Sequence, residues 1–216
     1  MKRLIVYDLD GTLVDTLEDI AQAANHMLRE LGAVPLPASE IRPFVGRGLQ
    51  ELVKGCLRTD DPAQAERGSK IYRAYYTQHL VEHSRLYPGA REVLDHFRPR
   101  AQAVISNKPN PYSSDILRAL GVAGYFIRVV GGDSEYPRKP DPSSIRAIME
   151  QAGVSPRETL FIGDSPIDVE TGRSAGIVTI AVTHGFSDEE ELRAAAPDAL
   201  VPSFPELLAL AKQQGW

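Results

Sequence analysis

Two aspartates two positions apart form the most reactive-looking segment of this chain. Asp8 and Asp10 follow the apolar run Leu4–Tyr7 and precede Gly11, which favours a turn. Residues i and i+2 of a strand point to one face, so both carboxylates could flank one point in space. Such a pair attracts a cation, and one member could attack an electrophile while the other moves a proton. A turn-and-cap role would explain Asp10, but not Asp8 at the end of a buried strand.

Three further segments carry polar side chains that could join this pair. Ser106 follows an apolar run, Asp164 follows another with Asp168 one helical turn later, and Lys139 comes just before a predicted helix. Each of these residues also has a simpler interpretation when it is taken singly. Ser106 could cap a helix, and Lys139 could be a surface lysine. Asp164 and Asp168 could be a helix cap and a solvated helix position. Because ligands of open α/β sheets bind at the carboxyl ends of the strands, the four segments together predict one site.

The donor set of this predicted site contains oxygen and no imidazole or thiolate. Four carboxylates, those of Asp8, Asp10, Asp164 and Asp168, would lie close together. Such hard ligands favour magnesium, which binds a few protein carboxylates together with waters and substrate phosphate. Lys139 would supply a point charge for a phosphate oxygen or an aspartate.

The elements that must position these residues alternate between strand and helix from residue 86 onward. Continuous apolar runs without polar alternation suit a parallel sheet that is buried on both faces. Helical patterns lie between the runs, which predicts a doubly wound α/β sheet with a Rossmann-like core. The predicted strands after the first are Ala103–Ile105, Phe126–Val130, Thr159–Ile162, Val178–Val182 and Ala199–Val201.

A different pattern occupies the chain between the first strand and the rest of this sheet. Apolar residues recur there at helical spacing in three stretches, and no strand pattern appears. We therefore expect an all-helical insert over residues 16–85, with the core formed by residues 1–15 and 86–216. The three predicted helices run through Leu17–Leu31, Leu49–Cys56 and Ile71–Tyr76.

Composition limits the class of protein. The chain has 216 residues, a net charge of −5 and a single cysteine, Cys56. These values suggest no nucleic-acid partner, no anionic membrane surface and no disulfide framework. No apolar run approaches the ~20 residues that span a bilayer, and the N-terminus does not resemble a signal peptide. We expect a cytoplasmic protein that acts on a small molecule; the choice between monomer and homodimer stays open.

The combination of segments resembles the haloacid dehalogenase-like hydrolase superfamily over essentially the whole chain. Asp8–Asp15 is similar to the first motif of that superfamily, Ser106 to the second, Lys139 to the third and Gly163–Asp168 to the fourth. The helical insert resembles the type-1 cap of the superfamily. Three shorter segments resemble its phosphoglycolate phosphatases: Ser106–Pro109, Gly131–Asp133 and Val45–Leu49.

The resemblance implies a magnesium-dependent phosphomonoester hydrolase. Asp8 would attack phosphorus and form an aspartyl-phosphate, while Asp10 would protonate the leaving oxygen and later deprotonate water. Magnesium would be bound by Asp8, the backbone carbonyl of Asp10, and Asp164. Lys139 would offset the negative charge of Asp8 and the phosphoryl group, and Asp168 would orient Lys139 or a water.

Substrate contacts are expected from both parts of the chain. Ser106 and the amides of Leu9 and Asn107 would bind phosphate oxygens. Arg47, flanked by two glycines in the helical insert, is the candidate for a distal carboxylate of the substrate; a solvated arginine in a hinge loop is the alternative.

The resemblance leaves several reactions open. The expected substrate is 2-phosphoglycolate, and the alternatives are inorganic pyrophosphate, a sugar phosphate, or a phosphomutase reaction. Phosphomutases of the superfamily carry a cap histidine where this chain has Ile20, which argues against the last. A haloacid dehalogenase would not need Asp10, and a non-enzymatic phospho-acceptor domain would need neither Asp10 nor the cap.

Overall fold

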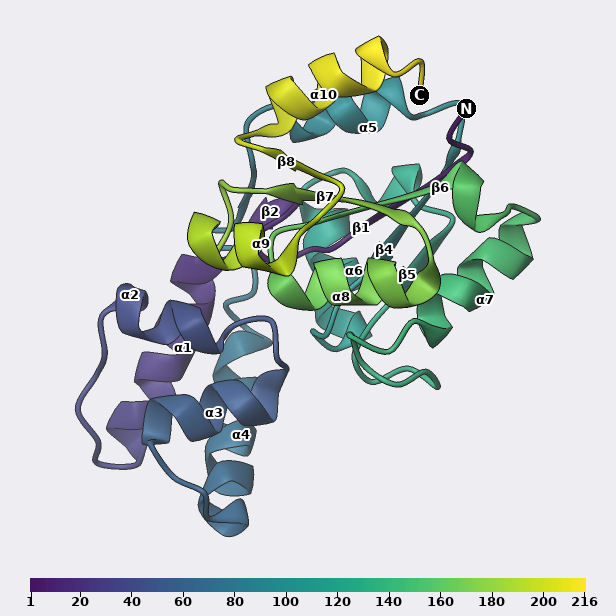
Figure 1. Cartoon of the computed structure of the whole chain (residues 1–216). Helices are drawn as coiled ribbons and strands as arrows, with labels where there is room; N and C mark the ends of the chain where they lie inside the picture. Colours follow the sequence, from purple (N-terminus) through teal and green to yellow (C-terminus); the bar gives the residue numbers. More distant parts are fainter.

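A computed structural model describes residues 1–216. Six parallel strands form the central sheet in the order β5-β4-β1-β6-β7-β8. The first strand lies in the middle and the chain winds outward on both sides of it, as the sequence predicts for a doubly wound sheet (Figure 1). The strands are β1 (Leu4–Tyr7), β4 (Ala101–Ile105), β5 (Arg128–Val130), β6 (Thr159–Gly163), β7 (Val178–Val182) and β8 (Ala199–Val201).

Helices cover both faces of this sheet, which explains why its strands are apolar without alternation. Ile5 and Tyr7 of β1 belong to one core cluster, whereas Leu4 and Val6 belong to another, because successive side chains point to opposite faces. The first face packs against α5 (Ala90–His96), α6 (Asn110–Ala119) and α10 (Phe204–Gln213). The second packs against α7 (Ser143–Ala152), α8 (Pro166–Ala175) and α9 (Glu189–Ala195).

Four helices form a separate helical lobe, the cap, at the lower left of Figure 1. They have their own cluster of buried side chains, which includes Met27, Leu28, Val53 and Tyr76. The helices are α1 (Leu17–Glu30), α2 (Ala38–Ile41), α3 (Leu49–Leu57) and α4 (Pro62–Tyr76). Three short 3-10 turns complete the helical elements: Arg42–Phe44 in the cap, and Ala123–Tyr125 and Pro156–Glu158 in the core.

The helix α4 begins well before the predicted stretch Ile71–Tyr76. Asp61 caps it by accepting a hydrogen bond from the N–H of Ala63 at 2.9 Å, and Pro62 occupies the first helical position. The first half of α4 is mostly polar or small and shows no apolar period. Its start is therefore visible only through the cap signal.

A two-stranded antiparallel ribbon links cap and core. It pairs β2 (Val14–Asp15), where the chain enters the cap, with β3 (Arg85–Leu86), where the chain returns to the core. The predicted boundaries of the helical insert, residues 16 and 85, lie at this ribbon. These exact boundaries stay a prediction. No helix of the structure is long and apolar enough to cross a membrane.

Candidate active site

Asp8 and Asp10 follow β1 and lie at the carboxyl edge of the sheet. The backbone N–H of Asp8 donates to Ile162 O at 2.9 Å, which ties the end of β1 to β6. Gly11 then turns the chain with φ +82°, and a Cβ there would lie 2.3 Å from Asp164 Oδ2. Only glycine satisfies both the backbone angle and this close approach. Both aspartates are buried.

Asp164 and Asp168 follow β6 and lie at the same edge of the sheet. Asp164 accepts hydrogen bonds from Thr12 Oγ1 at 2.6 Å and from the N–H of Phe186 at 2.7 Å. Ser165 caps α8, and Asp168 completes a capping box with it, which fixes the aspartate in the first turn. Asp164 and Asp168 therefore lie at the same edge of the sheet as Asp8.

Lys139 lies between two of these carboxylates. Its Nζ is 2.8 Å from Asp8 Oδ1 and 2.6 Å from Asp168 Oδ1, and its side chain is 3% exposed. Burial alone would lower the pKa of Lys139, but Asp168 and Asp8 outweigh it and raise that pKa above the usual lysine range. The ammonium therefore stays charged and holds Asp8 in place.

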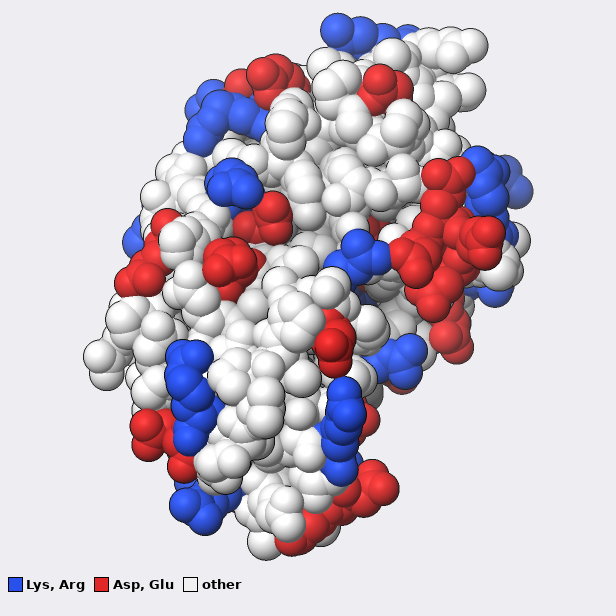
Figure 2. Space-filling view, turned by 90° about the vertical axis from the view of Figure 1, so that its left-hand side faces the viewer, with Lys and Arg blue, Asp and Glu red and all other residues white.

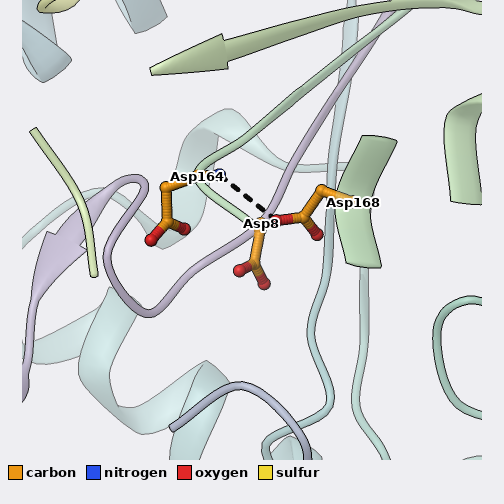
Figure 3. A group of neighbouring side chains, drawn as sticks. All are labelled: Asp8, Asp164 and Asp168. Atoms are coloured by element: carbon orange, nitrogen blue, oxygen red, sulfur yellow. Dashed lines mark hydrogen bonds between the residues drawn. The ribbon is translucent and has the colours of Figure 1, made fainter. Parts of the chain in front are cut away.

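Three carboxylates form a buried cluster suited to a cation. Ligand oxygens of Asp8, Asp164 and Asp168 all lie within 4.8 Å of one another (Figure 3). Asp8 Oδ1 is buried without a hydrogen-bond donor aligned to it, although the Lys139 ammonium is nearby. Burial, only partly offset by Lys139, raises the pKa of Asp8 to about 7, and burial together with Asp8 and Asp168 raises the pKa of Asp164.

The charge of the site fits a divalent metal. Asp8, Asp10, Asp164 and Asp168 face two ammonium groups, those of Lys139 and Lys108, which leaves two negative charges uncompensated. Buried carboxylates need a cation or a proton to offset this repulsion, and an all-oxygen donor set suits a hard divalent ion. Asp168 is committed to Lys139 and to three donors from residues 164–165. Asp8 and Asp164 are thus the better placed metal ligands.

Asp10 does not join this cluster and instead faces the cap. Its Oδ1 accepts hydrogen bonds from Thr16 Oγ1 at 2.7 Å and from Lys108 Nζ at 2.8 Å, and Lys108 also lies 3.0 Å from Oδ2. The sequence analysis gives Lys108 no role, and a lysine three residues past a strand is ordinarily solvated. Its side chain is only 7% exposed, and the one signal was its place beside Ser106.

The other predicted substrate contacts divide into two groups. Ser106 is buried just after β4, the strand that pairs with β1, and the backbone N–H groups of Leu9 and Asn107 donate to no backbone carbonyl. These N–H groups are free to bind an anion at the strand ends. The side chain of Asn107 connects loops: it donates to Gly46 O and Lys139 O and accepts from the N–H of Lys139.

Arg47 is not brought to the carboxylates. Its exposed side chain lines a surface hollow of the cap with Glu51, Lys54 and Arg58. The flanking residues Gly46 and Gly48 line the cavity between cap and core instead.

Charged side chains outside the site are mixed. On the face drawn in Figure 2, lysines and arginines are scattered among aspartates and glutamates. That face therefore presents no continuous basic surface.

Comparison with known proteins identifies the family. Residues 5–182 match the family model of the haloacid dehalogenase-like hydrolases. A phosphoglycolate phosphatase of Pseudomonas putida is 34% identical, covering 96% of this chain and 79% of its own length, and one of Nitrosospira multiformis is 36% identical, covering 96% and 95%.

Solved structures agree with this assignment. A predicted phosphoglycolate phosphatase from Haemophilus somnus has a TM-score of 0.91 at 27% identity, over 97% of this chain and 98% of the other. A predicted phosphatase from Clostridium acetobutylicum has a TM-score of 0.87 at 27% identity, over 99% of each chain. With its motifs meeting at one edge of the sheet, this chain belongs to the haloacid dehalogenase-like hydrolase family and is a phosphatase.

Proposed function

We propose that this enzyme hydrolyses a small phosphomonoester, 2-phosphoglycolate, with magnesium and through an aspartyl-phosphate on Asp8. The observation that carries the proposal is the buried cluster of Asp8, Asp164 and Asp168 with Lys139 bound between two of them. The similarity to enzymes named phosphoglycolate phosphatase supports the choice of substrate.

In the first step an oxygen of Asp8 attacks phosphorus while the bond from phosphorus to the leaving oxygen breaks. Lys139 keeps the Asp8 carboxylate oriented and offsets the negative charge that gathers during attack. Ser106 and the free amides of Leu9 and Asn107 bind the phosphoryl oxygens. Mg²⁺, held by Asp8, Asp164 and the backbone carbonyl of Asp10, would supply positive charge to the phosphoryl group. Asp168 positions Lys139 from its other side.

Asp10 moves the proton in both steps. It protonates the leaving oxygen, and it then takes a proton from the water that attacks the aspartyl-phosphate and releases phosphate. Its place on the cap side, bonded to Thr16 and Lys108, puts it where the leaving group would depart. Ile20 lines the same cavity and has no proton to transfer, which supports hydrolysis over the phosphomutase alternative.

A substrate panel tests the proposal. We expect magnesium-dependent release of phosphate to be fastest from 2-phosphoglycolate, compared with pyrophosphate, glucose 6-phosphate and p-nitrophenyl phosphate. Asp8→Asn should lower every rate by more than about a hundredfold, because the amide is a poor nucleophile. Asp60→Asn, at an exposed cap position, is the matched control and should retain activity. Preference for pyrophosphate or the sugar phosphate would replace the proposed substrate, and an active Asp8→Asn enzyme would refute the covalent mechanism.

A further inference from the structure

A small cavity lies between cap and core on the leaving-group side of Asp10. Its volume is about 50 Å³, and Asp10 and Lys108 form its core wall. The cap wall is mostly apolar and includes Ile20, Leu49, Leu52 and Tyr76. Because Asp10 protonates the leaving oxygen in the proposed reaction, the rest of the leaving group must extend into this space.

Charge in the cavity is concentrated on one residue. Among the side chains that line it, Lys108 is the only cation. Its Nζ lies 5.0 Å from the centroid of the Tyr76 ring and makes two contacts with the oxygens of Asp10. An ammonium group has three N–H donors, so one donor remains for a ligand.

An unused hydroxyl accompanies this ammonium. Tyr76 is 1% exposed, and its hydroxyl oxygen has no hydrogen-bond partner. A buried hydroxyl without a partner is unfavourable and uncommon, and because Tyr76 lines the cavity, a polar ligand that reaches this hydroxyl would satisfy it. The tyrosine comes from the cap and the lysine from the core, so a ligand that touches both would connect the two parts.

We propose that Lys108 and the Tyr76 hydroxyl together bind the carboxylate of the leaving group. This inference rests on the proposed function and names the residues that select its substrate. A carboxylate entering an otherwise apolar cavity needs both a countercharge and hydrogen-bond donors, and these two residues supply them.

The size of the cavity favours the same class of substrate. A volume near 50 Å³ exceeds the roughly 10–15 Å³ that one enclosed water needs, so the cavity has room for a small group of a few non-hydrogen atoms. A carboxymethyl group has four such atoms. A short phosphorylated hydroxy acid thus fits this space.

Arg47 is the other candidate for binding the substrate carboxylate, and its position differs from that of Lys108. The side chain of Arg47 lines an exterior hollow of the cap and does not line the cavity. If a cation binds the carboxylate in this arrangement of cap and core, the geometry assigns that role to Lys108.

The test compares 2-phosphoglycolate with ethyl phosphate, in which a methyl group replaces the carboxylate. The measured quantity is the ratio of kcat/KM for the two substrates, so that effects on Asp10 that are common to both cancel. Lys108→Met should lower this ratio about tenfold to a hundredfold, and Tyr76→Phe about tenfold. Lys108→Arg, which keeps the charge, should retain most of the preference. Lys54→Met removes an exposed cap cation outside the cavity and should leave the ratio unchanged.

Different failures have different meanings. A wild-type enzyme that does not prefer 2-phosphoglycolate over ethyl phosphate would overturn the proposed substrate. A preference that survives in both Lys108→Met and Tyr76→Phe, or that is lost only in Arg47→Met, would overturn this inference alone. If Lys108→Met is too slow on both substrates for a ratio, Tyr76→Phe decides, since it leaves the contact between Lys108 and Asp10 in place.

Discussion

Asp19 connects the two chain segments that join the cap to the core, which we call the hinge. Its carboxylate is 1% exposed and accepts hydrogen bonds from residues of the second connection. The N–H of Ser84 donates at 2.8 Å and its Oγ at 2.6 Å, and the N–H of His83 donates to both oxygens at 2.9 and 3.2 Å. One side chain at the start of α1 thus binds the chain where it leaves the cap.

Replacing Asp19 with alanine removes every one of these acceptors. The buried N–H of Ser84 loses its partner at a cost of about 1–3 kcal/mol, while the N–H of His83 is partly exposed and regains water. With the lost charge-assisted bonds, we expect the free energy of unfolding to fall by about 2–4 kcal/mol. For a chain of this size 1 kcal/mol corresponds to about 2–4 °C, so the Tm should fall by at least about 4 °C.

Thermal unfolding followed by circular dichroism measures this effect. Glu18→Ala is the matched control, because Glu18 is exposed in the same helical turn and bonds only to Gln22 there. We expect its Tm to stay within about 1 °C of wild type. Asp19→Asn keeps one acceptor oxygen and should lie between the two. An Asp19→Ala protein as stable as the Glu18→Ala protein would refute the hinge argument.

Four further outcomes follow from the site and the core. Asp10→Asn should slow ethyl phosphate hydrolysis more than p-nitrophenyl phosphate hydrolysis, because only the basic leaving oxygen needs a proton; equal losses would contradict the acid role. EDTA should abolish activity and Mg²⁺ restore it, while Ca²⁺ should restore little because of its looser coordination. Burial raises the pKa of Asp8 from 3.8 to about 7, so the metal-free protein should lose stability as the pH rises through that range. Mg²⁺ should therefore raise the Tm more at pH 8 than at pH 5.5. A Tm increase that does not depend on pH would count against the buried carboxylates. Burial raises the pKa of Cys56 to about 11, so about one thiol in a thousand is ionised at pH 8. Alkylation by iodoacetamide, measured by mass spectrometry, should therefore be at least about a hundredfold slower than for free cysteine. Rapid labelling would disprove the burial.

The core of the fold was predictable because two simple regularities act together. Runs such as Val178–Val182 are apolar throughout, which indicates a strand buried on both faces, and the structure has that strand within the same bounds. In a parallel sheet all carboxyl ends share one edge. The polar residues that follow β1 and β6 therefore had to meet, and Asp8 and Asp164 do so. Lys139, which comes before α7, joins them through its ion pair with Asp8.

The cap was predictable in kind and less so in detail. Its helices follow from apolar spacing, but the start of α4 at Pro62 depends on a capping bond that the spacing does not reveal. Where a cap side chain points relative to the core depends on how two lobes meet. For that reason neighbouring glycines drew attention to Arg47, while the structure turns that side chain away from the cavity.

The proposed role of Lys108 could not be predicted from its sequence neighbours. Its sequence neighbours place it at a strand end, but its side chain is buried and lies against the ring of Tyr76 in the cap, about thirty residues away in sequence. No local pattern records such a contact, because it forms only when cap and core pack together. The residues of the proposed phosphoryl transfer thus lie in short sequence motifs at the sheet edge. If the proposed role of Lys108 and Tyr76 is right, the choice of leaving group depends instead on contacts between cap and core, and changes on the cap side alone would alter the substrate.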